Sequence, residues 1–149
     1  MDIFAISPAS SKPLWFLAVI CVLLAGVVFA LAFTAYSSRT SRVELENNQI
    51  RLVGDFWGRD VPFKMLNVEG ARVVDLAKNS ELSPKHRTFG TGLPGYASGW
   101  FRLQNGEKAL AYLTQRQNVV YVPTSDGYSL LLSVEEPERF LQALQNRAR

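Results

Sequence analysis

From Leu14 to Tyr36 the chain reads LWFLAVICVLLAGVVFALAFTAY, which is 23 consecutive residues without a charged side chain. At a helical rise of about 1.5 Å per residue, this stretch extends roughly 34 Å, slightly more than the roughly 30 Å hydrocarbon layer of a bilayer. The sequence therefore predicts one transmembrane helix over residues 14–36. Trp15 and Tyr36 lie near its two ends, where amphipathic aromatic side chains prefer the membrane interface.

The same stretch has a second interpretation as a cleaved signal peptide. Ala30-Leu31-Ala32 has the small-x-small form that a signal peptidase accepts, and cleavage there would start the mature protein at Phe33. Against this, the apolar run is longer than the about 7–15 residues of a signal-peptide core, and Lys12 is the only basic side chain before it. We expect an uncleaved anchor, with a cleaved and exported β-domain as the alternative.

Basic residues on the two sides of the stretch predict its orientation. Lys12 and the terminal amine precede it, whereas Arg39, Arg42 and the more distant Arg51 follow it. The positive-inside rule applied to this small difference favours a cytoplasmic C-terminal domain. An N-terminal signal anchor with Lys12 inside would instead place the domain outside.

The length of 149 residues leaves room for one further compact domain. We expect a short polar tail over residues 1–13, a linker over residues 37–42 and a domain over residues 43–149. The net charge of +3 is dispersed rather than clustered, which argues against nucleic-acid binding. Cys21 is the only cysteine and lies in the apolar stretch, so the domain has no internal disulfide.

Alternation of apolar and polar residues predicts β-strands in the first half of the domain. Asn47-Asn48 separates two such runs and predicts a hairpin turn, while Pro62 marks an edge strand. Strands are expected over residues 43–45, 50–52, 61–66 and 71–76. No regular pattern appears over residues 77–97, for which we expect a long loop.

The second half of the domain has clearer strand patterns. Asn105-Gly106 and Asp126-Gly127 predict tight turns, and Asn105 and Gly106 are expected to take the two positive-φ positions of theirs. Four strands are therefore expected to form a meander over residues 99–103, 107–114, 119–122 and 128–132. Ser133 and Glu136 have the spacing of a capping box before Pro137, which predicts a C-terminal helix. Its apolar stripe contains Phe140, Leu141 and Leu144.

Several short motifs in the second half occur together in a familiar order. They are Gly90-Thr91-Gly92-Leu93-Pro94-Gly95-Tyr96, Gly99-Trp100-Phe101, Asn105-Gly106-Glu107-Lys108, Tyr121-Val122-Pro123-Thr124, Asp126-Gly127-Tyr128 and Leu131-Leu132-Ser133, followed by Pro137 and Phe140. In this order they resemble the signature of a family of bacterial PH-domain-like proteins, over roughly residues 43–145. The resemblance implies a mainly β fold, a seven-stranded antiparallel barrel capped by a C-terminal α-helix. With the anchor, it implies a protein of the bacterial inner membrane.

The resemblance also directs attention to basic side chains. Family members that bind phosphoinositides place several Lys and Arg residues around the first hairpin loops, where this chain offers only Arg59 over residues 54–60. Lys85 and Arg87 lie together in the expected long loop. We therefore predict Arg59, Lys85 and Arg87 as contacts for a ligand. Phe56 and Trp57 either insert at the membrane interface or pack on the sheet.

The residues do not predict catalysis, a metal or a cofactor. The glycine-rich run over residues 90–95 lacks the Lys-Ser or Lys-Thr of a phosphate-binding loop. His86 is the only histidine, too few with no cysteine in the domain for a zinc site, and a hydrolase using it is the least favoured alternative. We expect a non-enzymatic, single-pass membrane protein whose domain contacts the bilayer, a protein partner, another copy of itself or lipid headgroups.

Overall fold

The computed structural model describes residues 10–54 and 56–148, and the chain divides after Tyr36 into two compact units. Most of the predicted polar tail, residues 1–9, lies outside the described residues. Helix α1 (Lys12–Thr40) contains the predicted span and is apolar on all sides, with its large side chains exposed. Among the described residues it is the one helix long and apolar enough to cross a bilayer.

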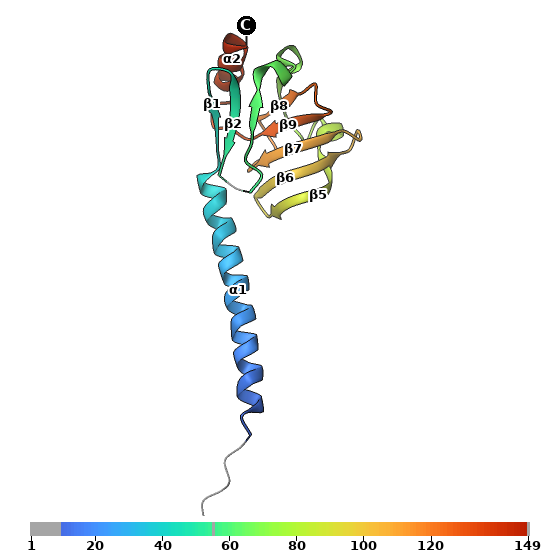
Figure 1. Ribbon diagram of the computed structural model, residues 1–149. Helices are drawn as coiled ribbons and strands as arrows, with labels where there is room; N and C mark the ends of the chain where they lie inside the picture. Colours follow the sequence, from blue (N-terminus) through green and yellow to red (C-terminus); the bar gives the residue numbers. More distant parts are fainter. Residues whose placement is uncertain (1–9, 55, 149) are drawn as a thin grey trace, which may run out of the picture. The chain divides into compact units, whose positions relative to one another are not determined.

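The folded domain begins with a small antiparallel sheet of three strands (Figure 1). These are β1 (Arg42–Leu45), β2 (Gln49–Val53) and β3 (Asp60–Pro62). The predicted hairpin is confirmed, since Val43 pairs with Leu52 across β1 and β2. The expected strand over residues 61–66 is shorter, because the chain turns into a 3-10 helix over Phe63–Met65 directly after Pro62.

A second sheet has six strands in the order β4-β8-β9-β7-β6-β5. The bounds are β4 (Arg72–Val74), β5 (Pro84–Leu93), β6 (Tyr96–Leu103), β7 (Lys108–Leu113), β8 (Val119–Pro123) and β9 (Tyr128–Leu132). Two further 3-10 helices, Val68–Gly70 and Ser80–Leu82, flank β4.

The predicted meander is wrong in its order. Strand β9 lies between β7 and β8 and runs parallel to β7, with Leu110 opposite Leu130. The β8–β9 hairpin itself forms as expected, since Val122 pairs with Leu130. Sequence neighbours usually pair, but here β9, all five of whose residues are buried, lies between the other two apolar strands.

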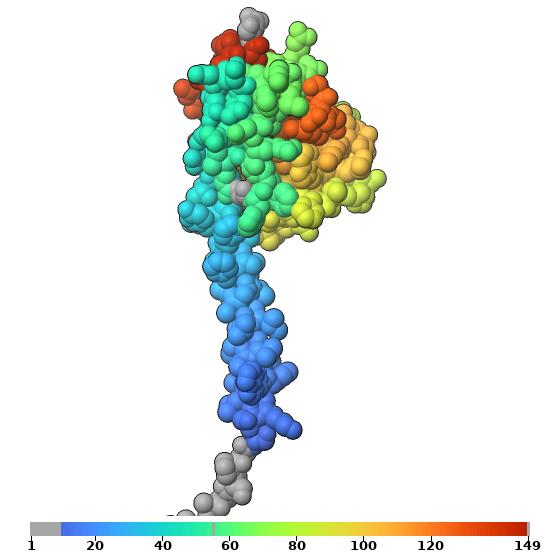
Figure 2. Space-filling model, in the orientation of Figure 1, coloured from blue at the N-terminus to red at the C-terminus, as the bar shows by residue number. Residues whose placement is uncertain are grey.

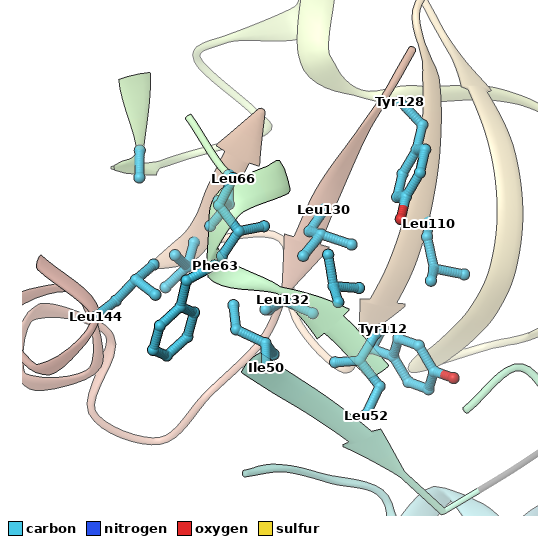
Figure 3. Packing of buried hydrophobic residues seen from close by; sticks show 14 residues of the cluster. Ile50, Leu52, Phe63, Leu66, Leu110, Tyr112, Tyr128, Leu130, Leu132 and Leu144 are labelled. Carbon is cyan, nitrogen blue, oxygen red and sulfur yellow. The ribbon is translucent and has the colours of Figure 1, made fainter. Parts of the chain in front are cut away.

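Both faces of β7, β8 and β9 are buried, which the alternation of their side chains shows. On one face Leu110, Val120 and Leu130 pack with residues of the small sheet, of the 3-10 helix after it and of the C-terminal helix (Figure 3). On the other face Ala111, Val119 and Leu131 pack under the segment between β4 and β5, which contributes Leu76 and Leu82. Strands buried on both faces have continuous apolar sequences, as these three do.

This arrangement corrects the expected barrel. The described residues form nine strands in two separate sheets, one of them mixed, rather than a closed barrel of seven antiparallel strands. In a small closed barrel the strands show one face to the interior and the other to solvent. The central strands here have two buried faces, so a layer covers each side instead.

The expected loop over residues 77–97 is also wrong, because β5 and the start of β6 occupy most of it. Gly90 and Gly99 face each other at positive φ, and a Cβ on Gly99 would lie 2.5 Å from the carbonyl oxygen of Phe89. The glycines thus allow the two backbones to approach closely in a bent hairpin. A glycine-rich run that looked irregular is therefore a strand.

The C-terminal helix α2 (Pro137–Arg147) is confirmed, with Pro137 in its first turn and Leu144 fully buried (Figure 3). The predicted capping box does not form. Glu136 occupies the N-cap position without a side-chain cap, and the Ser133 hydroxyl donates to the carbonyl of Gln115 instead. At the other end of α2, Arg147 donates to the carbonyl of Leu45 in β1.

The hairpin turn between β6 and β7 differs from the prediction in one position. Gly106 has a φ of 89°, but Asn105 is not among the residues of positive φ. The Asn105 side chain instead accepts a hydrogen bond from the backbone of Glu107 at 2.9 Å. One positive-φ residue therefore suffices for this turn.

A fragment of residues 37–149 should fold without the apolar helix. All residues of the two core clusters lie between Val43 and Leu144, so the deletion removes none of them. We expect a soluble product with a mainly β circular dichroism spectrum. A disordered or predominantly helical product would contradict the division of the chain after Tyr36.

Gly99→Ala should destabilise this fragment by about 3 kcal/mol or more, because the new Cβ meets backbone atoms and the positive φ is strained. Gly106→Ala is the matched control. It has a similar positive φ but open space around its Cβ, so it should cost only about 1 kcal/mol. Urea unfolding measures both, and equal losses would rule out the close approach as the cause.

Candidate functional site

A cavity of about 410 Å³ lies where the domain begins. Its walls come from the segment after α1, from β6 and β7, and from the connection between β9 and α2. The lining residues are Ser38, Ser41, Arg42, Val43, Tyr96, Tyr112, Thr114, Ser133, Val134 and Glu135. Six of these ten side chains carry a hydroxyl group, so the cavity presents many groups that can both donate and accept hydrogen bonds.

Ser41 connects two walls of this cavity. Its hydroxyl donates to the carbonyl of Ser37 at 2.7 Å and lies 3.2 Å from the phenolic oxygen of Tyr96. The one cation on the lining, Arg42, forms a 2.6 Å ion pair with Glu44. The lining also includes the carboxylate of Glu135, so the cavity combines hydroxyl groups with an anionic side chain.

A second feature is a group of cations on the aromatic rings of the six-stranded sheet. The guanidinium of Arg59 lies 5.4 Å from the ring centroid of Trp100 and 5.9 Å from that of Tyr128. Lys108 Nζ lies 4.4 Å from the Trp100 ring. Trp100 itself packs edge-on against Tyr128, with the two ring centroids 5.1 Å apart.

The structure does not gather the three predicted contact residues at one point. Arg87 pairs in register with Phe101, whereas Arg59 covers Trp100, and adjacent residues of a strand point to opposite faces. Lys85 and Arg87 are exposed on β5, at the edge of the sheet. The Arg87 guanidinium lies along this hairpin beside Gly92.

The remaining predicted positions lie apart from these features. Trp15 and Tyr36 are exposed near the two ends of α1. His86 is exposed on β5 and pairs in register with Arg102. No group of three His, Cys, Asp or Glu side chains in the described residues could hold a metal ion.

Burial raises the pKa of one tyrosine in the core cluster that also contains Leu76, Leu82 and Leu131. Desolvation raises the pKa of Tyr121, whose hydroxyl donates to Glu107 Oε2 at 3.0 Å. Ser129 donates to the same carboxylate oxygen at 3.2 Å, and Arg72 lies over the Tyr121 ring. These contacts satisfy polar groups within the sheet and do not form a pair of nucleophile and base.

An aromatic group on the surface combines residues from two distant segments. Trp57 meets Phe89 edge-on, with ring centroids 5.0 Å apart, and Phe56 is 80% exposed beside them. In Figure 2 the green segment after β2 adjoins the yellow-green atoms of β5. The sequence pointed to Phe56 and Trp57 but missed Phe89. The alternation of Phe89, Thr91 and Leu93 with glycines is the strand pattern that could have found it.

Removing Arg59 tests whether it serves the fold or a ligand. Arg59→Ala should lower the free energy of unfolding by about 1 kcal/mol, because it removes a cation from two aromatic rings. Lys85→Ala and Arg87→Ala are the controls, and should stay within about 0.5 kcal/mol of the parent because both side chains are exposed. Equal stability of all three variants would leave Arg59 without a structural role.

Comparison with known proteins gives one match. Neither a curated protein nor a solved structure shows significant similarity to the chain. The sequence profile of a family described as bacterial PH domain matches residues 41–148, which is well over half of the chain and includes all nine described strands and helix α2. The resemblance noted from the motifs is therefore confirmed, and this chain belongs to the bacterial PH domain family.

Proposed function

We propose that this protein is a single-pass membrane protein whose PH domain is a tethered binding or scaffolding module. The observation that carries the proposal is the direct connection of two parts. The exposed apolar helix α1 ends at Thr40, and the PH domain match begins at residue 41. A helix that is apolar on all sides is stable in a bilayer or a protein core, and the α1 side chains are exposed.

Tethering supplies the mechanism. A domain held at a bilayer meets other membrane components at a high effective concentration, so contacts that are weak in solution become occupied. PH domains are in general binding modules rather than catalysts, and the hydroxyl-lined cavity offers hydrogen bonds for such a contact. We propose a protein partner, a second copy or a lipid headgroup as the bound group.

The contact residues and the location follow from the same proposal. Lys85 and Arg87 are the basic side chains offered to a ligand, and Arg59 would contribute through its exposed guanidinium. We place the protein in the bacterial inner membrane, with the domain on the cytoplasmic side as the basic residues around α1 favour. A fusion of the domain to a soluble carrier would lose the effect of tethering.

Membrane fractionation of the expressed full chain tests the anchor. The full chain should stay in the membrane pellet after alkaline carbonate washing, because α1 is in the hydrocarbon layer. Deletion of residues 12–36 should release the protein, and replacing them with an unrelated transmembrane helix should restore it to the pellet. Release of the full chain by carbonate would contradict the anchor.

The cleaved, exported form remains the second candidate, and one observation keeps it in view. The compact domain begins at Ser37, so cleavage before Phe33 would leave it whole. The intact mass of the purified protein separates the two candidates. A mass that starts at Phe33 would establish cleavage, and a mass with the original N-terminal region would exclude it.

A further inference from the structure

We propose that Phe56, Trp57 and Phe89, called here the aromatic patch, form a second membrane contact that docks the PH domain on the bilayer surface. The inference rests on the proposed function, since it needs α1 to be in a membrane. It adds a surface, an occupant and an orientation that tethering alone does not give.

Two of the three side chains of the aromatic patch are largely exposed. Phe56 is 80% exposed and Phe89 is 66% exposed. Trp57, which follows Phe56 in the loop after β2, packs edge-on against Phe89 of β5. Aromatic side chains brought together from two distant segments mark a surface that meets something apolar or interfacial. Tryptophan and phenylalanine are also the residues that lie in the headgroup boundary of membrane-associated proteins.

The path along the chain from the anchor to the aromatic patch is short. Ser41 follows the last residue of α1 and is five residues beyond Tyr36, the end of the apolar stretch. Gly54 contacts Ser41 so closely that a Cβ on Gly54 would lie 2.3 Å from Ser41 Cα. Phe56 is two residues beyond Gly54, which is at most about 7 Å of extended chain. The anchor therefore keeps this part of the domain near the bilayer.

The charge near the aromatic patch is positive. Arg59, in the same loop as Phe56 and Trp57, and Lys108 both lie over the ring of Trp100, which pairs in register with Phe89. Basic side chains beside inserted aromatic rings are attracted to the anionic headgroups of a membrane surface. A second copy of the domain would instead bring the same cations against each other, so the charge favours a lipid surface as the occupant.

Depth-dependent quenching on the full chain in nanodiscs of phosphatidylcholine and phosphatidylglycerol tests the proposal. In a Cys21→Ser background, Phe56→Cys carries an environment-sensitive fluorophore, and lipids spin-labelled at different depths act as quenchers. We expect blue-shifted emission and shallow quenching that is several-fold stronger than at Asn105→Cys. The control position Asn105 lies in the turn after Leu103, the last residue of β6. Tyr96, whose hydroxyl lies near that of Ser41, is at the other end of the same strand.

Substitution of the neighbouring ring gives a second readout. Phe89→Ser should reduce quenching of the label at position 56 several-fold, because it removes the β5 ring of the aromatic patch, against which Trp57 packs. Leu93→Ser is the matched control, since Leu93 is also an exposed apolar residue of β5 but is not part of the aromatic patch. Circular dichroism of each variant checks that the fold is kept.

A label on the native Cys21 separates failure of the proposal from failure of the anchor. Quenching at Cys21 without quenching at position 56 would overturn the docking surface and leave the anchor in place. No quenching at Cys21 would remove the anchor and, with it, the docking surface. A label at position 56 that is shielded from aqueous iodide but not quenched by lipid would identify a protein contact and overturn the lipid assignment.

Discussion

Burial of both faces of β7, β8 and β9 is the constraint on which the rest of the domain depends. Their side chains alternate between two apolar clusters, so each face needs its own cover. The small sheet and α2 cover one face, and the segment between β4 and β5 covers the other. What stays at the surface is the far edge of the sheet, where β5 carries basic and aromatic side chains that no core requires. The candidate contacts are therefore at the rim of the domain.

The apolar helix and the domain require different surroundings. Helix α1 has no polar face, so water is an unfavourable environment for it and a bilayer is a favourable one. The domain satisfies its own polar groups, as the contacts among Tyr121, Ser129 and Glu107 show. Five residues after the apolar stretch, Ser41 already contacts both β6 and the loop after β2. The proposed membrane contact near Ser41 relies on this short connection.

Local patterns predicted the elements better than their arrangement. The apolar run from Leu14, the β1–β2 hairpin and the helix after Pro137 each follow from spacing within a few residues. The place of β9 between β7 and β8 depends on which strands bury two faces, a property that nearest neighbours in the sequence do not encode. The sequence pattern did not predict strand β5, because its glycines, which a bent hairpin needs, resemble those of a loop. Phe89 was missed for the same reason, and Trp57 was paired with it only in three dimensions.

The proposed function requires that helix α1 crosses a membrane and holds the PH domain there. Epitope tags at the two ends of the chain, probed by external protease before and after the membrane is opened, test it most directly. If α1 crosses the membrane as proposed, the tags will be on opposite sides, with the C-terminal tag protected until the inner membrane is opened. Tags on the same side, or a C-terminal tag released into the soluble fraction, would contradict it.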